Sequence, residues 1–318
     1  MAVRLGRVFD DKTRRVVTSE VYRRSRDVRG GVFRVLLQIA LLVALLVLAI
    51  LLVDTVTDGW SILDGRLGDF LAGGLRSQSG DPELGVFQGI RGSLWIAVFV
   101  IVLAFPLGIG AAVYLEEYAP KSRLTSFIDL NIRNLAGVPS VVYGLLGLAI
   151  FVRGLKDLTG GQSVTAAGIT LAVLVLPIVI ITSAEAIRAV PQSLREAGYG
   201  AGATRWEVIR TQVLPYAAPG ILTGTLLSLS RAIGEAAPLI LVGAVTGFLG
   251  GQSGLVDVSQ LQERFTALPI IITEWVQESG RDRGFAPAAA AAIVVMLVVV
   301  LLLNSAAILL RNHFEKKR

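Results

Sequence analysis

Two charged residues four positions apart interrupt a long apolar stretch of the sequence. They are Arg231 and Glu235, within the segment from about Ala217 to Gly247. Residues at this spacing project from one face of a helix. A charge deep in lipid costs on the order of 2.5–3.5 kcal/mol on insertion scales, so we expect the pair to face protein or water. A guanidinium there would offer a positive charge and a planar fork of donors to a passing oxyanion.

Two roles are open for this pair. In the first, Arg231 contacts an anion in a pathway, and Glu235 holds the guanidinium in place and keeps it from trapping the anion. In the second, the two side chains form a structural ion pair that fixes helix register, since buried pairs can serve structural specificity. We predict the substrate pathway and keep the structural pair as the alternative.

Two further charged pairs lie near the ends of apolar segments. Asp129 and Arg133, also four residues apart, suit an interfacial pair with snorkelling side chains. Glu185 and Arg188 end another apolar segment and could brace the polar segment that follows it. We favour these structural roles over a role in transport.

A hydrophilic island occupies residues 191–215, between two apolar segments. Ser193 to Ala201 can form a short helix, and Gly202 can take a positive φ and turn the chain. Thr204 can cap a second helix through Gln212, which Pro215 would stop. Two short helices at an angle form a compact knob that can sit in a groove on a cytoplasmic partner. The alternative is an amphipathic loop on the membrane surface.

Composition identifies the class of protein that must position these residues. The chain has 318 residues, is 53% hydrophobic and has a mean hydropathy of +0.68, which indicates an integral membrane protein. The absence of cysteine excludes disulfides and cysteine metal sites. A formal charge of +6 is compatible with nucleic-acid binding, but the basic residues lie beside hydrophobic spans, so membrane topology explains them more simply.

Six segments are long enough to cross the hydrocarbon core, which takes roughly 20 apolar residues. They run from about Val32 to Val53, Gly92 to Leu115, Phe127 to Val152, Val164 to Ile187, Ala217 to Gly247 and Pro287 to Leu310. Prolines and glycines inside them are tolerated because packed neighbours satisfy the freed backbone groups. We therefore predict an all-α polytopic membrane protein with six transmembrane helices.

The distribution of Lys and Arg predicts the orientation. Residues 1–31 and 311–318 are strongly basic, whereas residues 54–90 are mostly acidic. Since six spans return the chain to its starting side, we place both termini and the 188–215 loop in the cytoplasm. A cleaved signal peptide is the alternative for the first span, but its apolar run is long and no small-residue cleavage site follows it cleanly.

No pattern in the sequence predicts catalysis or a metal site. A Walker-type ATP site needs G-x-x-x-x-G-K-[ST], and no Lys follows a Gly in this chain. The lone His313 lies in the basic tail, and zinc needs several ligands. We predict no catalytic residue, no metal and no cofactor in this chain.

The island resembles the EAA loop of ABC importer permeases, which reads E-A-A, three residues, G, nine residues and I-x-L-P. The matching positions are Glu196, Ala197, Gly202, Leu214 and Pro215. The sequence departs from the pattern at Gly198, where the family prefers Ala, and at Gln212, where it prefers Ile. The resemblance implies that the five matching residues couple the chain to an ATPase.

Three more stretches are similar to the phosphate-specific permeases of the PstA type. They are residues 131–148, 231–239 and 265–269, and the similarity covers roughly residues 90–310. The EAA loop alone specifies an ABC importer permease, and these stretches narrow the resemblance to phosphate. In that family the arginine and glutamate matched by Arg231 and Glu235 are regarded as important to transport.

The resemblance implies a type I ABC importer permease fold and a place in a bacterial or archaeal inner membrane, among lipid. It implies one half of a phosphate pathway, completed by a related permease of the PstC type. A cytoplasmic ATPase dimer of the PstB type would bind ATP and Mg, and an extracytoplasmic binding protein of the PstS type would deliver phosphate. Nucleic acid is not an expected partner.

The expected organisation follows from these assignments. It comprises a basic arm (1–31), a first helix with an extracytoplasmic loop (32–91), a permease core (92–310) and a basic tail (311–318). Three other functions stay open: a permease for molybdate or sulfate, a scaffold that signals phosphate status, and a self-contained channel.

Overall fold

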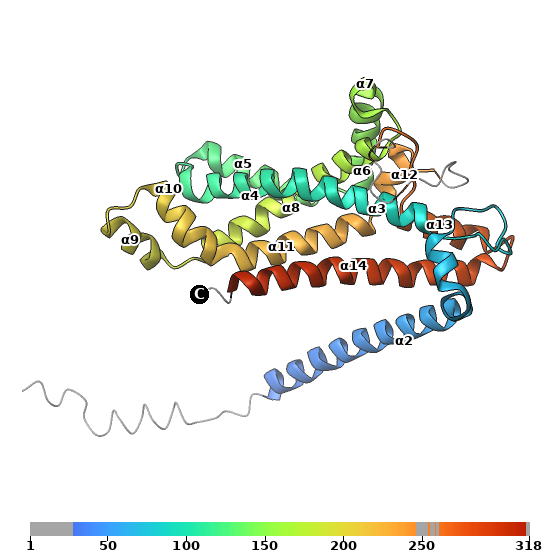
Figure 1. Cartoon of the computed structure of the whole chain (residues 1–318). Helices are drawn as coiled ribbons and strands as arrows, with labels where there is room; N and C mark the ends of the chain where they lie inside the picture. Colours follow the sequence, from blue (N-terminus) through green and yellow to red (C-terminus); the bar gives the residue numbers. More distant parts are fainter. Residues whose placement is uncertain (1–27, 246–253, 255–257, 259–260, 316–318) are drawn as a thin grey trace, which may run out of the picture. The chain divides into compact units, whose positions relative to one another are not determined.

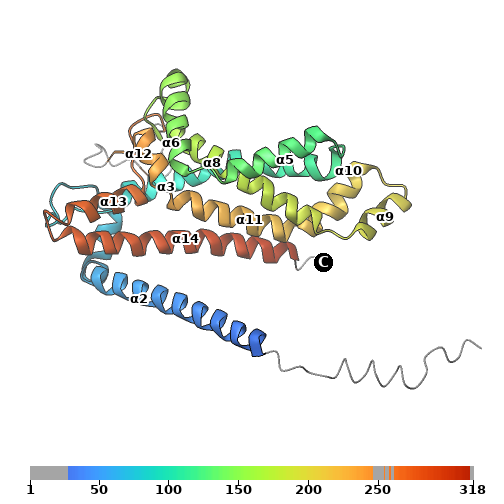
Figure 2. The ribbon, with the colours of Figure 1, turned by 180° about the vertical axis from the view of Figure 1, so that it is seen from behind.

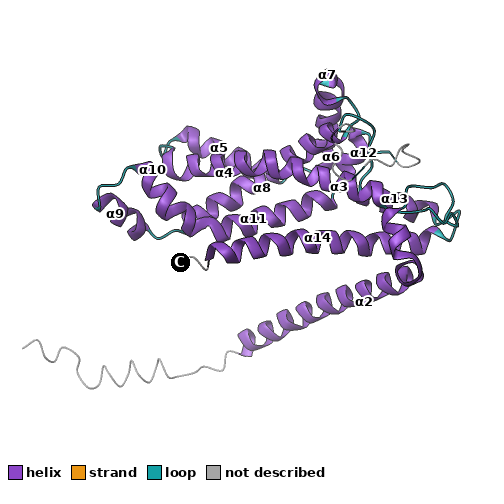
Figure 3. Ribbon diagram, in the orientation of Figure 1, coloured by secondary structure: helices purple, strands orange, loops and turns teal. Residues whose placement is uncertain are grey.

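The computed structural model describes residues 28–245, 254, 258 and 261–315. In these residues the regular elements are helices, apart from one isolated bridge between Gly74 and Leu84 (Figure 3). The predicted all-α class is therefore confirmed. The chain divides into two compact units, Met1–Asp54 and Thr55–Arg318.

Five described helices are long and apolar enough to cross a membrane. They are Gly30–Ala72, Phe87–Tyr118, Val164–Arg188, Arg205–Gly234 and Phe285–Ala306. A sixth candidate is a helix pair, Arg123–Ala136 and Ser140–Gly154, bent by 97° at its break. The predicted six spans are found if this bent pair counts as one.

The first candidate span belongs to α2 (Val28–Ala72), which has non-helical φ and ψ angles at Arg66. In the first unit, each described residue from Gly31 to Asp54 is exposed, and most of these residues are aliphatic. So large an apolar surface is unfavourable in water, and a lipid environment removes that cost.

Helix α8 (Val164–Arg188) is the centre of the second unit, and more than half of it is buried. It packs against the long helix formed by α3 (Phe87–Phe99), η1 (Val100–Ala104), α4 (Phe105–Val113) and η2 (Tyr114–Tyr118). It also packs against α11 (Leu214–Gly234) (Figures 1 and 2). Gly220 and Gly224 lie against Ala186 and Thr182 of α8, where added side chains would collide. The two helices therefore cross closely at this glycine pair.

Residues after Asp54 join the second unit through a separate apolar cluster. Phe70 and Phe285 each lie 6.0 Å, between ring centroids, from Trp275 of α13 (Leu268–Glu278). Gly59 lies against the backbone of α14 (Phe285–Glu315), so closely that a side chain would not fit. The cluster fixes α13 and the start of α14.

The third predicted span, 127–152, is not one straight helix. It consists of α5 (Arg123–Ala136), α6 (Ser140–Gly147) and η3 (Leu148–Gly154), with the 97° bend after α5. Pro139 lacks an N–H and disfavours helical angles at the residue before it, so the helix stops there. The Tyr143 hydroxyl donates to the Leu135 carbonyl at 2.9 Å and so bridges the bend.

The fifth predicted span, 217–247, was also wrong as a continuous helix. Helix α11 ends at Gly234, and a short helix α12 (Ala237–Val242) follows. The ring of Pro238 would clash with the carbonyl of Gly234, four residues earlier, which explains the end of α11. Gly243 stops α12 with a φ of 99°, so it acts as a turn residue. The predicted end of this span, Gly247, lies outside the described residues.

Short elements complete the second unit. They are α7 (Lys156–Thr159), α9 (Gln192–Gly200), α10 (Arg205–Val208) and η4 (Ile209–Val213).

Candidate functional site

The two broken helices pack against each other at their second halves. A β-carbon added to Gly144 of α6 would lie 2.7 Å from the α-carbon of Pro238 in α12. Only glycine permits this approach of the two backbones. The contact joins two of the three stretches that carry the sequence resemblance, residues 131–148 and 231–239.

The third stretch, residues 265–269, packs beside them. The carbonyl of Phe265 accepts a hydrogen bond from the Val245 amide at 2.9 Å. The amide of Leu268 donates to the Ser93 hydroxyl at 3.0 Å. Tyr143, Ile233, Leu239 and Phe265 belong to one buried apolar cluster. The fold thus brings together segments that are far apart in the sequence.

Arg231 and Glu235 form an ion pair beside this junction, with 3.3 Å between Nε and Oε1. Glu235 is not on the helical face predicted for it, because α11 ends at Gly234 and Glu235 has an extended backbone (φ −82°, ψ 115°). The pair is therefore made across the helix end. The side chain of Arg231 is 54% exposed and that of Glu235 is 19% exposed. An anion could reach the guanidinium while the carboxylate holds it.

The island folds as a helical hairpin, residues 191–215. Helix α9 spans Gln192–Gly200, and Gly202 turns the chain with a φ of 83°, as predicted. Thr204 caps α10 and forms a capping box with Glu207, so the predicted cap is also confirmed. The prediction that Pro215 stops the second helix was wrong. The helix runs without a break from Arg205 to Gly234. The π-helical turn η4 directly precedes α11, whose first turn holds Pro215, and such a wider turn accommodates a proline that lacks the N–H of a regular helical residue.

The residues matched to the EAA pattern occupy different surroundings. Glu196 and Ala197 are exposed on α9, and Gly202 and Pro215 are exposed as well. Leu214 is half-buried and packs against the apolar cluster at the base of the hairpin. This arrangement leaves one side of α9 open to a partner.

The structure also shows why the two departures from the EAA pattern, Gly198 and Gln212, are tolerated. Gly198 faces Val208, and an added β-carbon would lie 2.8 Å from a Val208 methyl group. A glycine there lets α9 and α10 pack closely. Gln212 is exposed, which a polar side chain tolerates.

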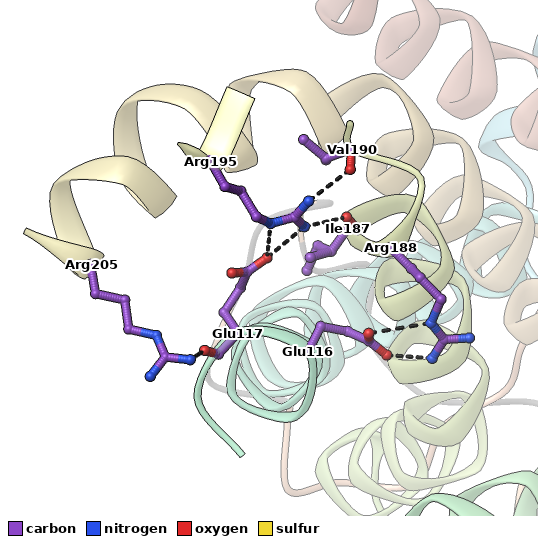
Figure 4. A network of polar contacts seen from close by, with 7 residues as sticks. All are labelled: Glu116, Glu117, Ile187, Arg188, Val190, Arg195 and Arg205. Carbon is purple, nitrogen blue, oxygen red and sulfur yellow. Dashed lines mark hydrogen bonds and ion pairs between the residues drawn. The ribbon is translucent and has the colours of Figure 1, made fainter. Parts of the chain in front are cut away.

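The end of the second span, η2, holds the hairpin through a polar network (Figure 4). Arg195 of α9 donates to Oε1 of Glu117 from Nη2 at 2.7 Å and from Nε at 3.1 Å. Its Nη1 donates to the Val190 carbonyl at 2.7 Å, and its Nη2 to the Ile187 carbonyl at 3.0 Å. Arg205 of α10 donates to the backbone carbonyl of Glu117.

Comparison with known proteins identifies the family. Residues 104–318 match the family described as "Binding-protein-dependent transport system inner membrane component". The chain is 35% identical over 252 residues to "Phosphate transport system permease protein PstA 1" of Mycobacterium tuberculosis (strain ATCC 25618 / H37Rv), covering 78% of this chain and 76% of that one.

The chain belongs to this permease family. A shorter match, 41% identical over 162 residues, is to "Probable ABC transporter permease protein YqgH" of Bacillus subtilis (strain 168), covering 49% of this chain and 51% of that protein. The chain spans about half the length of this relative and of others like it. The predicted PstA-type resemblance is nevertheless confirmed by the longer match.

A solved structure shows the same fold. The bacterial alginate ABC transporter, in complex with an alginate pentasaccharide-bound periplasmic protein, contains a chain that matches with a TM-score of 0.60 at 14% identity. The match covers 88% of this chain and 93% of that chain. The permease thus has the predicted type I importer fold, and at this identity the likeness concerns the fold alone.

Sequence reasoning missed Glu116 and Glu117 in this permease. It ended the second span at Leu115, whereas the helix continues to Tyr118. Two adjacent glutamates directly after an apolar run were the available signal, but their partners come from residues more than 70 positions away. Arg188, expected to brace the hairpin, pairs with Glu116 of η2 instead.

Proposed function

We propose that this chain is the transmembrane permease subunit of an ATP-driven importer of inorganic phosphate. The observation that carries the proposal is the match to a PstA phosphate permease over more than three quarters of both chains. The meeting of the three PstA-like stretches beside an exposed arginine supports it further.

Arg231 and Glu235 lie on the proposed phosphate pathway. Helix α11 begins at Leu214, so Arg231 lies about 25 Å along its axis, given a rise of about 1.5 Å per residue. With the hairpin in the cytoplasm, as proposed, this length would put Arg231 toward the outer side of a hydrocarbon core about 30 Å thick. Interrupted helices are tolerated at such depth where they are buried in protein or line a watery cavity, and transporters use such breaks for substrate sites.

The permease works with partners that supply the rest of the cycle. A related permease of the PstC type encloses the other half of the pathway, and an extracytoplasmic protein of the PstS type delivers phosphate. A cytoplasmic ATPase dimer of the PstB type binds ATP and Mg and hydrolyses ATP, so this chain is not itself an enzyme. ATP binding moves the 191–215 hairpin and opens the pathway outward, and hydrolysis resets it.

The proposed topology places both termini and the hairpin in the cytoplasm. The basic termini and the acidic first loop motivate it. A Cys introduced at Asp64, in a chain without native cysteine, is expected to react with an impermeant maleimide added outside the cell. A Cys at Lys121 should react only after the membrane is opened. The reverse pattern of labelling would refute the orientation.

The function is tested with the permease co-expressed with its three neighbouring subunits and reconstituted in vesicles. We expect ATP-dependent uptake of labelled phosphate, and stimulation of ATP hydrolysis by phosphate-loaded binding protein. Stimulation by molybdate or sulfate but not phosphate would reassign the substrate. Uptake without ATP would favour a channel, and regulation without any uptake would favour a signalling scaffold.

A further inference from the structure

The joint between η2 and the hairpin has a role that the EAA pattern does not assign. We propose that Glu117 and Arg195 are positioning residues that make the hairpin and the second span (Phe87–Tyr118) move as one body. The proposal rests on the proposed function as an ATP-driven permease.

Burial and charge support this role. The side chain of Glu117 is 6% exposed and that of Arg195 is 13% exposed. Removing one partner of such a buried pair leaves an uncompensated charge, so the pair resists separation when the hairpin is displaced. The neighbouring pair of Glu116 and Arg188 is more open, with Arg188 54% exposed. Exposed pairs contribute little, so the buried pair is the stronger link.

The guanidinium of Arg195 joins three elements at once. It donates to the carboxylate of Glu117 in η2, to the carbonyl of Ile187 in the last turn of α8 and to that of Val190, just after this helix. Arginine presents a rigid fork of donors, which suits it to contact several acceptors in a fixed geometry. The position of α9 is thereby fixed relative to both spans (Figure 4).

The second helix of the hairpin is attached to the same end of the second span. Arg205, the first residue of α10, donates to the carbonyl of Glu117, and its guanidinium carbon lies 4.9 Å from the centre of the Tyr118 ring. Such a cation–π contact adds to the attachment. Both hairpin helices therefore hold η2.

The second span extends this attachment to the other end of the fold. The helix is continuous from Phe87 to Tyr118, so it can transmit a displacement as a rigid element. At its far part, Ser93 bonds to the Leu268 amide beside the 265–269 stretch. The chain itself connects the hairpin only to α8 and α11. Through the joint, the hairpin also acts on the helix that contacts the proposed pathway region.

The test measures the ratio of phosphate transported to ATP hydrolysed in reconstituted complexes. Glu117→Gln and Arg195→Gln are expected to lower this ratio by about fivefold or more, because the hairpin moves without the second span. Arg195→Lys keeps the charge but loses the fork, so it should give an intermediate ratio. Glu116→Gln is the matched control, since Glu116 is the neighbouring glutamate and its carboxylate contacts Arg188 of α8 and not the hairpin. It should keep the wild-type ratio.

The outcomes separate the two proposals. Wild-type complexes that fail to transport phosphate would overturn the proposed function. Wild-type transport with an unchanged ratio in both Gln variants would overturn the joint. A parallel loss of uptake and ATP hydrolysis would also overturn it, because that result indicates a role in folding or assembly alone.

A direct measurement of motion needs no transport. Spin labels on Cys residues at Gln192 of α9 and Lys121 after η2 report the distance between hairpin and second span. With Glu117 present, we expect one narrow distance distribution, unchanged by ATP. With Glu117→Gln, it should broaden and respond to ATP. A wild-type distance that changes with ATP would refute movement as one body.

Discussion

Replacing Arg231 with Gln is expected to lower phosphate uptake by about tenfold or more, which corresponds to about 1.4 kcal/mol or more of lost transition-state stabilisation. The variant leaves no positive charge to offset the desolvation of phosphate and leaves Glu235, which is mostly buried, without its ion-pair partner. Arg231→Lys should recover uptake only in part, since it keeps the charge and loses the planar fork. The measurement is uptake of labelled phosphate at matched membrane levels.

Controls separate a pathway role from a structural one. Arg281→Gln removes an arginine from a more exposed pair, with Glu278, and should leave uptake unchanged. The double variant Arg231→Gln with Glu235→Gln removes both charges of the proposed pathway pair. Near-normal uptake by this double variant would show that the pair is structural, and the pathway role would have to be abandoned.

Replacing Gly202 with Val is expected to reduce phosphate uptake about tenfold while the protein still enters the membrane. Gly202 has a φ of 83°, and a left-handed backbone costs an L-residue about 1–2 kcal/mol, with β-branched residues disfavoured further. The strain would change the angle between α9 and α10 and so the surface offered to the ATPase. Uptake and co-purification of the ATPase are both measured.

Gly200 provides a matched control for this variant. At either glycine, an added β-carbon meets no heavy atom of the described residues within 4 Å, its local backbone aside, but only Gly202 has a positive φ. Gly200→Val therefore adds the same side chain with much less backbone strain, and it should keep most of the uptake. Equal losses in the two variants would mean that bulk on the hairpin surface, and not the turn, is responsible.

The sequence by itself determined the features that depend only on residues close together along the chain. Apolar runs predicted the spans, because crossing a hydrocarbon core needs length and composition alone. The turn at Gly202 and the cap at Thr204 were also predictable, because both depend on the conformational and hydrogen-bonding properties of single residues. The local signals of Pro139 and Pro238 were present too, but the apolar composition around them favoured unbroken spans.

Tertiary structure alone decided which distant groups meet. Nothing near Glu117 in the sequence indicates that it is buried, because its burial depends on Arg195, 78 positions later. The contact of Gly144 with Pro238 likewise depends on how two broken helices cross. A charge can be buried, and two backbones can touch, only when the fold supplies a partner of the right shape and charge, and that partner is not encoded locally.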